Sequence, residues 1–260
     1  MRRAKADDYW RRTVDLDRAR PICLTKVQID RLDESNAFSI DLHPALTVLC
    51  GGNGVGKTTL LKLCLLVTCS DCVSQKFRQR LLEVAVTLTA RIKNSEAIFS
   101  RIDGDLLLPP SSPNVVFLDA SADWYKARAL IESEANWEEL LAQHGANELQ
   151  EKDLKELSYI TGKNYSSCRV YEIDDFDEPV IFCFVEVDGK TYGLHEMGAG
   201  EGALFIAWWT LSNISEVTLI LMEEPEAHVP PRSQRALMDL LAKRCSKQCS
   251  AVVTTHSSAI

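Results

Sequence analysis

The sequence predicts an α/β protein with a mixed β-sheet core, and three short apolar runs support this fold class. Residues 45–50, 217–222 and 251–255 have the continuous apolar pattern of strands buried on both faces. Each run is followed at once by glycine, acidic or other polar residues. Because open α/β sheets bind ligands beyond the carboxyl ends of their strands, these three strand ends are the first candidates for a functional site.

Two antiparallel β segments are expected beside this core. Residues 22–29 and 38–42 alternate loosely between apolar and polar residues, which is typical of paired strands. The same pattern returns at residues 169–173, 180–187 and 191–194. The sequence thus predicts an antiparallel β subdomain in addition to the buried strands.

Helices are predicted between the strands from the spacing of apolar residues. One follows the first buried run, at residues 59–67, and two occupy residues 122–141 and 148–159. Two more, at 202–212 and 233–244, precede and follow the second buried run. These helices are expected to cover the sheet and to form a helical insert.

The predicted organisation is a single domain whose middle is an insert. Residues 81–118 mix strand-like stretches with glycine and prolines and give the weakest pattern in the chain. The domain is expected to span residues 1–260, with core halves at 1–60 and 160–260 around a helical lobe at 61–159.

Composition and charge favour a globular cytoplasmic protein. The chain is 46% hydrophobic and 25% charged, and its first twenty residues contain no apolar segment of signal-peptide length. Apolar stretches such as residues 203–211 are too short to span a bilayer, so no membrane contact is expected. A net charge of −8 disfavours wide non-specific contact with DNA, although a local basic strip would be compatible with it.

Nine cysteines without a secretory signal are expected to be reduced thiols. The pair Cys69 and Cys72 and the pair Cys245 and Cys249 offer zinc-ligand spacing as an alternative. Both pairs fall at predicted helix ends, where small half-buried cysteines are common.

The strongest motif is Gly-Gly-Asn-Gly-Val-Gly-Lys-Thr at residues 51–58, between a buried strand and an apolar helix. In such a loop the glycines let the backbone surround phosphate oxygens, and the helix N-terminus faces the anion. Lys57 would reach the β- and γ-phosphates of ATP, and Thr58 would hold Mg²⁺. The candidate ATP-binding residues in the loop are Gly51, Asn53, Gly54, Gly56, Lys57, Thr58 and Thr59.

A second motif places two carboxylates at a strand end. The run Glu223-Glu224-Pro225-Glu226 follows an apolar strand, where an acidic turn could also be plain solvated loop. With a phosphate loop upstream, Glu223 is predicted to support the Mg²⁺ shell, and Glu224 to orient the water that attacks the γ-phosphate.

A third motif ends the last buried run with Thr-Thr-His-Ser at residues 254–257. A lone histidine at a strand end is more often structural. Because it follows the other two motifs in order, His256 is predicted to reach the γ-phosphate and is grouped with Glu224 and Lys57 as catalytic.

These motifs, at residues 45–60, 192–211 and 219–257, resemble the ABC-type ATPases of the OLD-like and related AAA defence and DNA-repair group. The resemblance implies that residues 197–201, Met-Gly-Ala-Gly-Glu, form a signature turn. In that group the turn contacts the γ-phosphate held by the opposite subunit, which adds Gly198, Gly200 and Glu201 to the ATP-binding candidates. Glycines here could equally mark only the entry to a helix.

The chain departs from the family pattern at two positions. Gly198 stands where the signature usually has serine, and Glu223 stands where many relatives have aspartate. Without this hydroxyl, the trans contact would rely on backbone N–H groups at the helix start. The glutamine of the family's Q-loop has no assignment, since neither Gln75 nor Gln79 has a distinctive context.

The resemblance implies an ATPase that forms a homodimer or higher homo-oligomer around ATP and Mg²⁺. It would regulate an associated effector, a nuclease or toxin in anti-phage defence. The alternatives are an SMC- or RecF-like DNA-repair ATPase, with nucleic acid as its partner, a transporter subunit, and a non-hydrolysing scaffold locked by ATP. The chain ends four residues after His256, where relatives continue with more of the core, so we expect that continuation to be absent. Either the sequence ends early, or any nuclease or toxin resides on a partner.

Overall fold

A computed structural model describes residues 3–30, 37–80, 84–102, 105–109, 112–176 and 179–260. Its centre is a four-stranded sheet in the order β3-β13-β12-β7, in which every neighbouring pair is parallel. The four strands are β3 (Leu46–Cys50), β7 (Asn114–Leu118), β12 (Thr218–Glu223) and β13 (Cys249–Thr255). The three predicted strands are therefore confirmed as parallel neighbours, and β7 is a fourth strand from the stretch with the weakest pattern. The burial predicted for both faces of residues 45–50 is wrong, because β3 lies at the edge of the sheet and its residues are half-buried or exposed.

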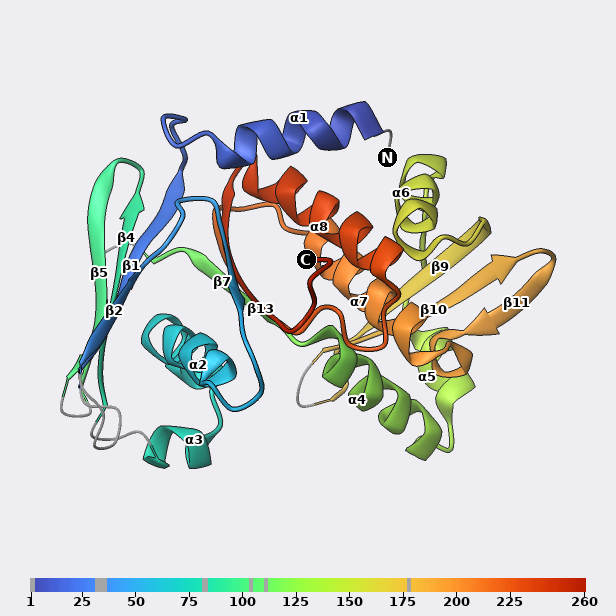
Figure 1. The fold of residues 1–260 in the computed structure, drawn as a ribbon. Helices are drawn as coiled ribbons and strands as arrows, with labels where there is room; N and C mark the ends of the chain where they lie inside the picture. Colours follow the sequence, from blue (N-terminus) through green and yellow to red (C-terminus); the bar gives the residue numbers. More distant parts are fainter. Residues whose placement is uncertain (1–2, 31–36, 81–83, 103–104, 110–111, 177–178) are drawn as a thin grey trace.

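Two hydrophobic cores lie on the two faces of the central sheet, and successive side chains of β12 and β13 point alternately into one and the other. Leu219, Leu221 and Val252 face a core that contains α2 (Lys57–Thr68). Ile220, Met222, Ala251 and Val253 face the opposite core, which contains the helices α4 (Ala120–Ser133), α7 (Ala199–Ser212) and α8 (Pro231–Cys245). Because successive side chains of a strand point to opposite faces, α2 and α7 are held on opposite sides of the central sheet (Figure 1).

A five-stranded antiparallel sheet, β2-β1-β4-β5-β6, packs with α2 on the first of these cores (Figure 1). Its members are β1 (Ile22–Asp30), β2 (Phe38–Asp41), β4 (Ala85–Ile92), β5 (Ser95–Ile102) and β6 (Asp105–Leu107). The predicted antiparallel pairing of β1 with β2 is confirmed. The short elements η1 (Ser70–Cys72) and α3 (Gln75–Arg80) connect α2 to this sheet.

A four-stranded sheet, β11-β10-β9-β8, forms the other side of the molecule (Figure 1). Its strands are β8 (Asn147–Glu148), β9 (Tyr165–Ile173), β10 (Val180–Val187) and β11 (Lys190–Gly193), with α5 (Trp137–Gln143), α6 (Glu151–Thr161) and η2 (Leu194–Glu196) nearby in sequence. The N-terminal helix α1 (Arg3–Val14) packs along α8, where the Trp10 indole donates to Asp239. Residues 61–159 thus supply strands to all three sheets.

The predicted helix at 122–141 is two helices in the structure. The chain leaves α4 at Glu134, whose backbone is extended, and α5 begins after Asn136. The change of direction lets α4 pack on α7 while α5 places Trp137 against Phe182 of β10. Tertiary packing of two separate apolar faces is therefore the reason for the break.

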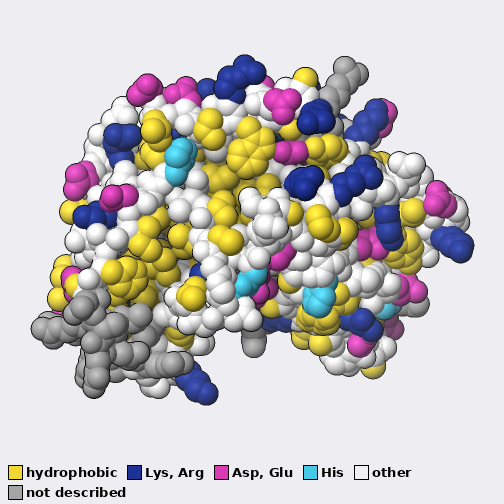
Figure 2. Space-filling view, in the orientation of Figure 1, with side chains coloured by type: hydrophobic (Ala, Val, Ile, Leu, Met, Phe, Trp, Pro, Cys, Tyr) yellow, Lys and Arg dark blue, Asp and Glu magenta, His cyan; other side chains and the backbone are white. Residues whose placement is uncertain are grey.

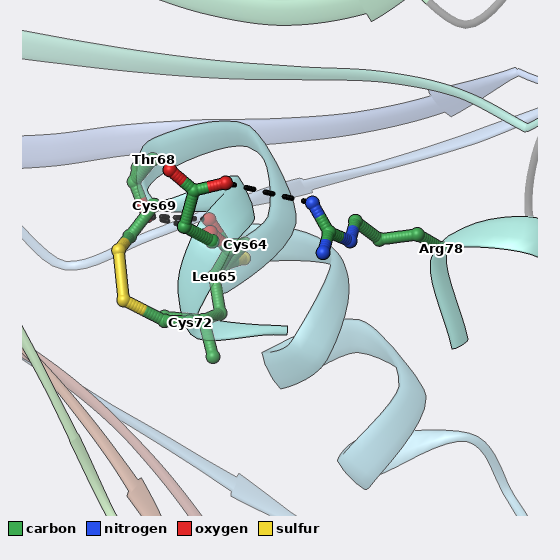
Figure 3. The surroundings of a disulfide bond; sticks show 7 residues. Cys64, Leu65, Thr68, Cys69, Cys72 and Arg78 are labelled. Carbon is green, nitrogen blue, oxygen red and sulfur yellow. Dashed lines mark hydrogen bonds and ion pairs between the residues drawn. A yellow bond between two sulfur atoms is a disulfide. The ribbon is translucent and has the colours of Figure 1, made fainter. Parts of the chain in front are cut away.

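The expectation that all nine cysteines are reduced is wrong, because Cys69 and Cys72 form a disulfide (Figure 3). Cys69 ends α2 and the η1 turn brings Cys72 back, so that the two Cα atoms lie 5.5 Å apart, within the range of disulfides. Cys245 and Cys249 are free and buried in the core on the other face of the central sheet. The two pairs therefore do not meet in one zinc site.

Among the described residues, no helix combines the length and the apolar character needed to cross a membrane.

Candidate functional site

The loops that carry the predicted site leave the same edge of the central sheet. The parallel register pairs Cys50 with Thr255 and Glu223 with Thr254, so β3, β13 and β12 end side by side. The glycine-rich loop, Glu224 and His256 follow these strands directly. The strand ends that the sequence singled out are therefore neighbours in space.

The glycine-rich loop leads into α2 with an open helix end. Gly54 and Gly56 have φ of 76° and 92°, a left-handed backbone that glycine adopts without steric cost. Gly56 is the N-cap of α2, and no side chain caps the helix. A Cβ placed on Gly52, Gly54 or Gly56 would meet no atom within 4 Å. The loop therefore has the free amide end and the open space that a phosphate group needs.

Lys57 is folded back over its own loop. Its Nζ donates to the carbonyl oxygens of Gly51 at 2.9 Å and Gly52 at 3.0 Å. The same Nζ lies 3.0 Å from Nε2 of His256. Asn53 is exposed in the loop, and Thr59 is half-buried in the first turn of α2.

His256 joins the lysine to the acidic turn. Its Nε2 lies 3.0 Å from Oε1 of Glu224, and its backbone N–H donates to Oε1 of Glu226. Glu224 has φ of 39°, a left-handed conformation that is uncommon for a non-glycine residue, and its N–H donates to the carbonyl of Thr254. Backbone strain of this kind concentrates at functional sites. The structure thus brings together the three residues predicted to be catalytic.

The candidate metal ligands lie on the α2 side of the sheet. Glu223 follows Leu221 in alternation, and its carboxylate lies 3.8 Å from Nζ of Lys62 on α2. Beside it in register, the Thr254 hydroxyl is buried without a hydrogen-bond partner among the described residues. Thr58 occupies the first turn of the same helix. Hydroxyl and carboxylate oxygens are ligands that Mg²⁺ accepts, so this donor set fits the ion.

The signature candidates lie at the start of α7, on the opposite side of the central sheet from α2. Gly198 is the N-cap, and a Cβ there would meet nothing within 4 Å. A Cβ on Gly200 would lie 2.2 Å from the carbonyl oxygen of His228, so the helix start rests against the turn that follows Glu224. The Glu201 carboxylate is turned toward Lys163 and two tyrosines.

The sequence did not identify the end of β7 as part of this edge. Ala120 and Ser121, which follow β7, line a small cavity together with Glu224 and Pro225. The available signal was an apolar run followed by a polar residue, Asp119, a pattern that the ends of β12 and β13 share. Gln75 and Gln79 are instead exposed on α3, beyond η1.

This fold and the converging motifs define a P-loop ATPase of the ABC type. The chain belongs to the AAA_21 family, described as "AAA domain, putative AbiEii toxin, Type IV TA system", whose model matches residues 87–260. The predicted AAA_21-type family is therefore confirmed. The glycine-rich loop precedes the matched segment.

Solved structures of Smc heads and of RecF share the fold at low sequence identity. An Smc head bound to the C-winged helix domain of ScpA has a TM-score of 0.54 and 14% identity, covering 91% of this chain and 90% of that one. A second structure is an Smc head with an extended coiled coil, bound to the C-terminal domain of ScpA derived from Pyrococcus furiosus. It has a TM-score of 0.55 and 13% identity, and the match covers 92% of this chain and 90% of that one. The recombination mediator protein RecF-ATPrS has a TM-score of 0.50 and 10% identity, and the match covers 93% of this chain and 94% of that one. No curated protein sequence matches the chain.

Proposed function

We propose that the chain binds ATP with Mg²⁺ and hydrolyses it, and that two copies assemble around the nucleotide. The observation that carries this proposal is the contact of His256 with both Lys57 and Glu224 beside an open helix end. A phosphate loop, a carboxylate and a histidine at one sheet edge supply the groups that phosphoryl transfer to water requires.

Each residue has a distinct role in this proposal. The loop amides and Lys57 bind the β- and γ-phosphates, so that Lys57 exchanges its carbonyl partners for phosphate oxygens. Glu224 orients the attacking water and accepts its proton, while His256 positions Glu224 and contacts the γ-phosphate.

Thr58 and Glu223 would hold Mg²⁺. When bound, the ion neutralises charge on the β- and γ-phosphates. In the described structure, Nζ of Lys62 lies 3.8 Å from the Glu223 carboxylate.

Assembly is supported by the place of α7. The N-terminus of α7 lies on the opposite side of the sheet from α2. It would therefore contact the nucleotide of a second copy and not the nucleotide of its own phosphate loop. The Smc heads carry a bound protein, ScpA, in their structures. The family description names a toxin of a toxin–antitoxin system. We infer an effector protein, a nuclease or toxin of anti-phage defence, as the partner of this ATPase.

The proposal is tested by the solution mass of the Glu224→Gln variant, measured by light scattering with and without MgATP. A nucleotide-dependent increase is the expected result, because the variant binds ATP without turning it over. An unchanged mass, in a variant that still binds ATP, would mean constitutive assembly or a site that works within one copy, and either result would contradict assembly driven by the nucleotide.

A DNA-repair ATPase is the second candidate, favoured by the fold shared with RecF and the Smc heads. On the face shown in Figure 2, Lys and Arg side chains are interspersed with Asp and Glu. Stimulation of the ATPase by duplex DNA ends would favour this candidate over the effector-linked one. Turnover no faster than the uncatalysed reaction would favour a non-hydrolysing scaffold over both.

A further inference from the structure

The start of α7 is a helix end that no side chain of the described chain caps. Gly198 is the N-cap, and the first intrahelical bond runs from the Gly202 N–H to the Gly198 carbonyl at 3.0 Å. The N–H groups before Gly202 therefore lack the regular helical acceptor four residues back. Such N–H groups, with the positive end of the helix dipole, attract anions.

Glu201 occupies the third position of this helix, where a glutamate commonly reaches back to the N–H of the N-cap residue. A neighbouring glutamate does so: Glu196 accepts from the Gly193 N–H at 2.8 Å at the start of η2. Glu201 does not reach back to Gly198, although its position is equivalent. The difference must come from what holds its carboxylate elsewhere.

Three side chains hold the Glu201 carboxylate away from the helix end. Tyr165 and Tyr192 donate their hydroxyls to Oε1 at 2.9 and 2.7 Å. Lys163 Nζ donates to Oε2 at 2.5 Å and to the Tyr192 hydroxyl at 3.0 Å. We call these three donors the Glu201 clamp. The Glu201 side chain is only 10% exposed.

The clamp comes from the β11-β10-β9-β8 sheet and the turn before β9, and not from α7. Lys163 lies between α6 and β9, Tyr165 begins β9, and Tyr192 is in β11. Burial raises the pKa of both tyrosines, so each hydroxyl stays a donor at neutral pH. Burial alone would lower the pKa of Lys163, but its hydrogen bonds to Glu201 and Tyr192 have the larger combined effect. The pKa of Lys163 is therefore raised, and the amine stays charged.

We propose that Lys163, Tyr165 and Tyr192 are positioning residues that withhold the Glu201 carboxylate from the Gly198 N–H, and so keep the start of α7 free for phosphate oxygens of ATP held by a second copy. This inference rests on the proposed assembly around ATP. Gly198 has no hydroxyl, so the free backbone N–H groups are the donors that remain for this contact. A carboxylate released onto the same helix end would occupy a donor and repel the phosphate.

The test releases the carboxylate and then removes it, in the Glu224→Gln background. The clamp variant Lys163→Met/Tyr165→Phe/Tyr192→Phe keeps Glu201. We expect MgATP-driven assembly, followed by light scattering, to weaken by at least about tenfold in Kd, because the charge now caps α7. Adding Glu201→Ala should restore assembly to within about threefold of the parent, since no carboxylate is left to compete. This expectation replaces the ATP contact predicted for Glu201, because the clamp holds its side chain away from the helix end. If the clamp served only packing, the fourth substitution would weaken assembly further instead of restoring it.

Two further measurements separate the inference from the function on which it rests. ATP affinity of the separated subunits should be unchanged in the clamp variant, since the phosphate loop lies across the sheet. Amide hydrogen exchange at Gly198 should slow in the clamp variant and return to its parent rate with Glu201→Ala. If the parent fails to assemble, the proposed function falls while the exchange result still tests the clamp. Unchanged exchange, or a fourth substitution that restores neither property, would overturn the inference.

Discussion

The Nε2 atom of His256 lies 3.0 Å from Oε1 of Glu224. The two residues follow adjacent parallel strands, β13 and β12, so the sheet register fixes the contact. The same nitrogen lies 3.0 Å from Nζ of Lys57. One ring nitrogen either donates to the carboxylate or accepts from the ammonium group, so these two contacts compete. If a phosphate group binds Nζ of Lys57, the Nε2 atom of His256 is left free to donate to Glu224.

Glu224→Gln should lower ATP turnover by about 10²- to 10⁴-fold, the usual contribution of a general base. The amide keeps the shape of the side chain but cannot accept a proton from water. Steady-state phosphate release measures turnover, and a fluorescent nucleotide measures binding, which should stay within about twofold. Glu216→Gln, on an exposed residue before β12, is the matched control. Normal turnover in Glu224→Gln would remove the residue's assigned role.

Lys57→Met should abolish detectable ATP binding, because the phosphates lose their one side-chain cation in the loop. The hydrogen bonds of Lys57 to two loop carbonyls are also lost, so thermal unfolding should be recorded beside nucleotide titration. Lys76→Met, at an exposed lysine of α3, is the control. Retained affinity in a folded Lys57→Met protein would contradict the assignment of the loop.

Gly200→Ala should destabilise the fold by about 1–3 kcal/mol, the usual cost of inserting atoms into a packed site. The new Cβ would lie 2.2 Å from the His228 carbonyl oxygen and would push α7 from the turn after Glu224. Gly198→Ala, two residues earlier, has open space and φ of −63°, so its effect should stay within about 0.5 kcal/mol. Urea unfolding of the two variants compares them directly, and equal stabilities would refute the close contact.

Alkylation should distinguish the cysteines by their environment. Without reductant, Cys50 should react, because it is the exposed free cysteine of the described chain. Burial raises the pKa of Cys64 to about 12, so this thiol should stay unmodified in the folded protein. Mild reduction should add Cys69 and Cys72, as read by peptide mass. Labelling of this pair before reduction would contradict the disulfide.

Alkaline stability should depend on Tyr159. Burial and the hydrogen bond to Asp239 raise the pKa of Tyr159 to about 12, while an unfolded tyrosine titrates near about 10. The unfolded state therefore loses its proton first, and the stabilisation is present below about pH 10 and lost between about pH 10 and 12. Tyr159→Phe should show a smaller drop in urea midpoint from pH 8 to pH 11 than the parent. Tyr125→Phe, at an exposed tyrosine, should decline like the parent.

The sequence by itself determined the order of the three motifs and the strands that carry them. An apolar run followed by glycines, glutamates or histidine specifies a strand and the place of its carboxyl end within a few residues. This is why Lys57, Glu224 and His256 could be predicted as one group before any contact was known. The class of ATPase followed from the same local patterns.

The tertiary structure alone decided which surfaces those motifs face. That β7 belongs to the central sheet, that α2 and α7 lie on opposite sides of it, and that Cys72 meets Cys69 all depend on packing. The Glu201 clamp joins residues 163, 165, 192 and 201, which no periodic pattern connects. Local patterns encode backbone conformation and burial, whereas partners distant in the chain are selected only when whole elements pack together.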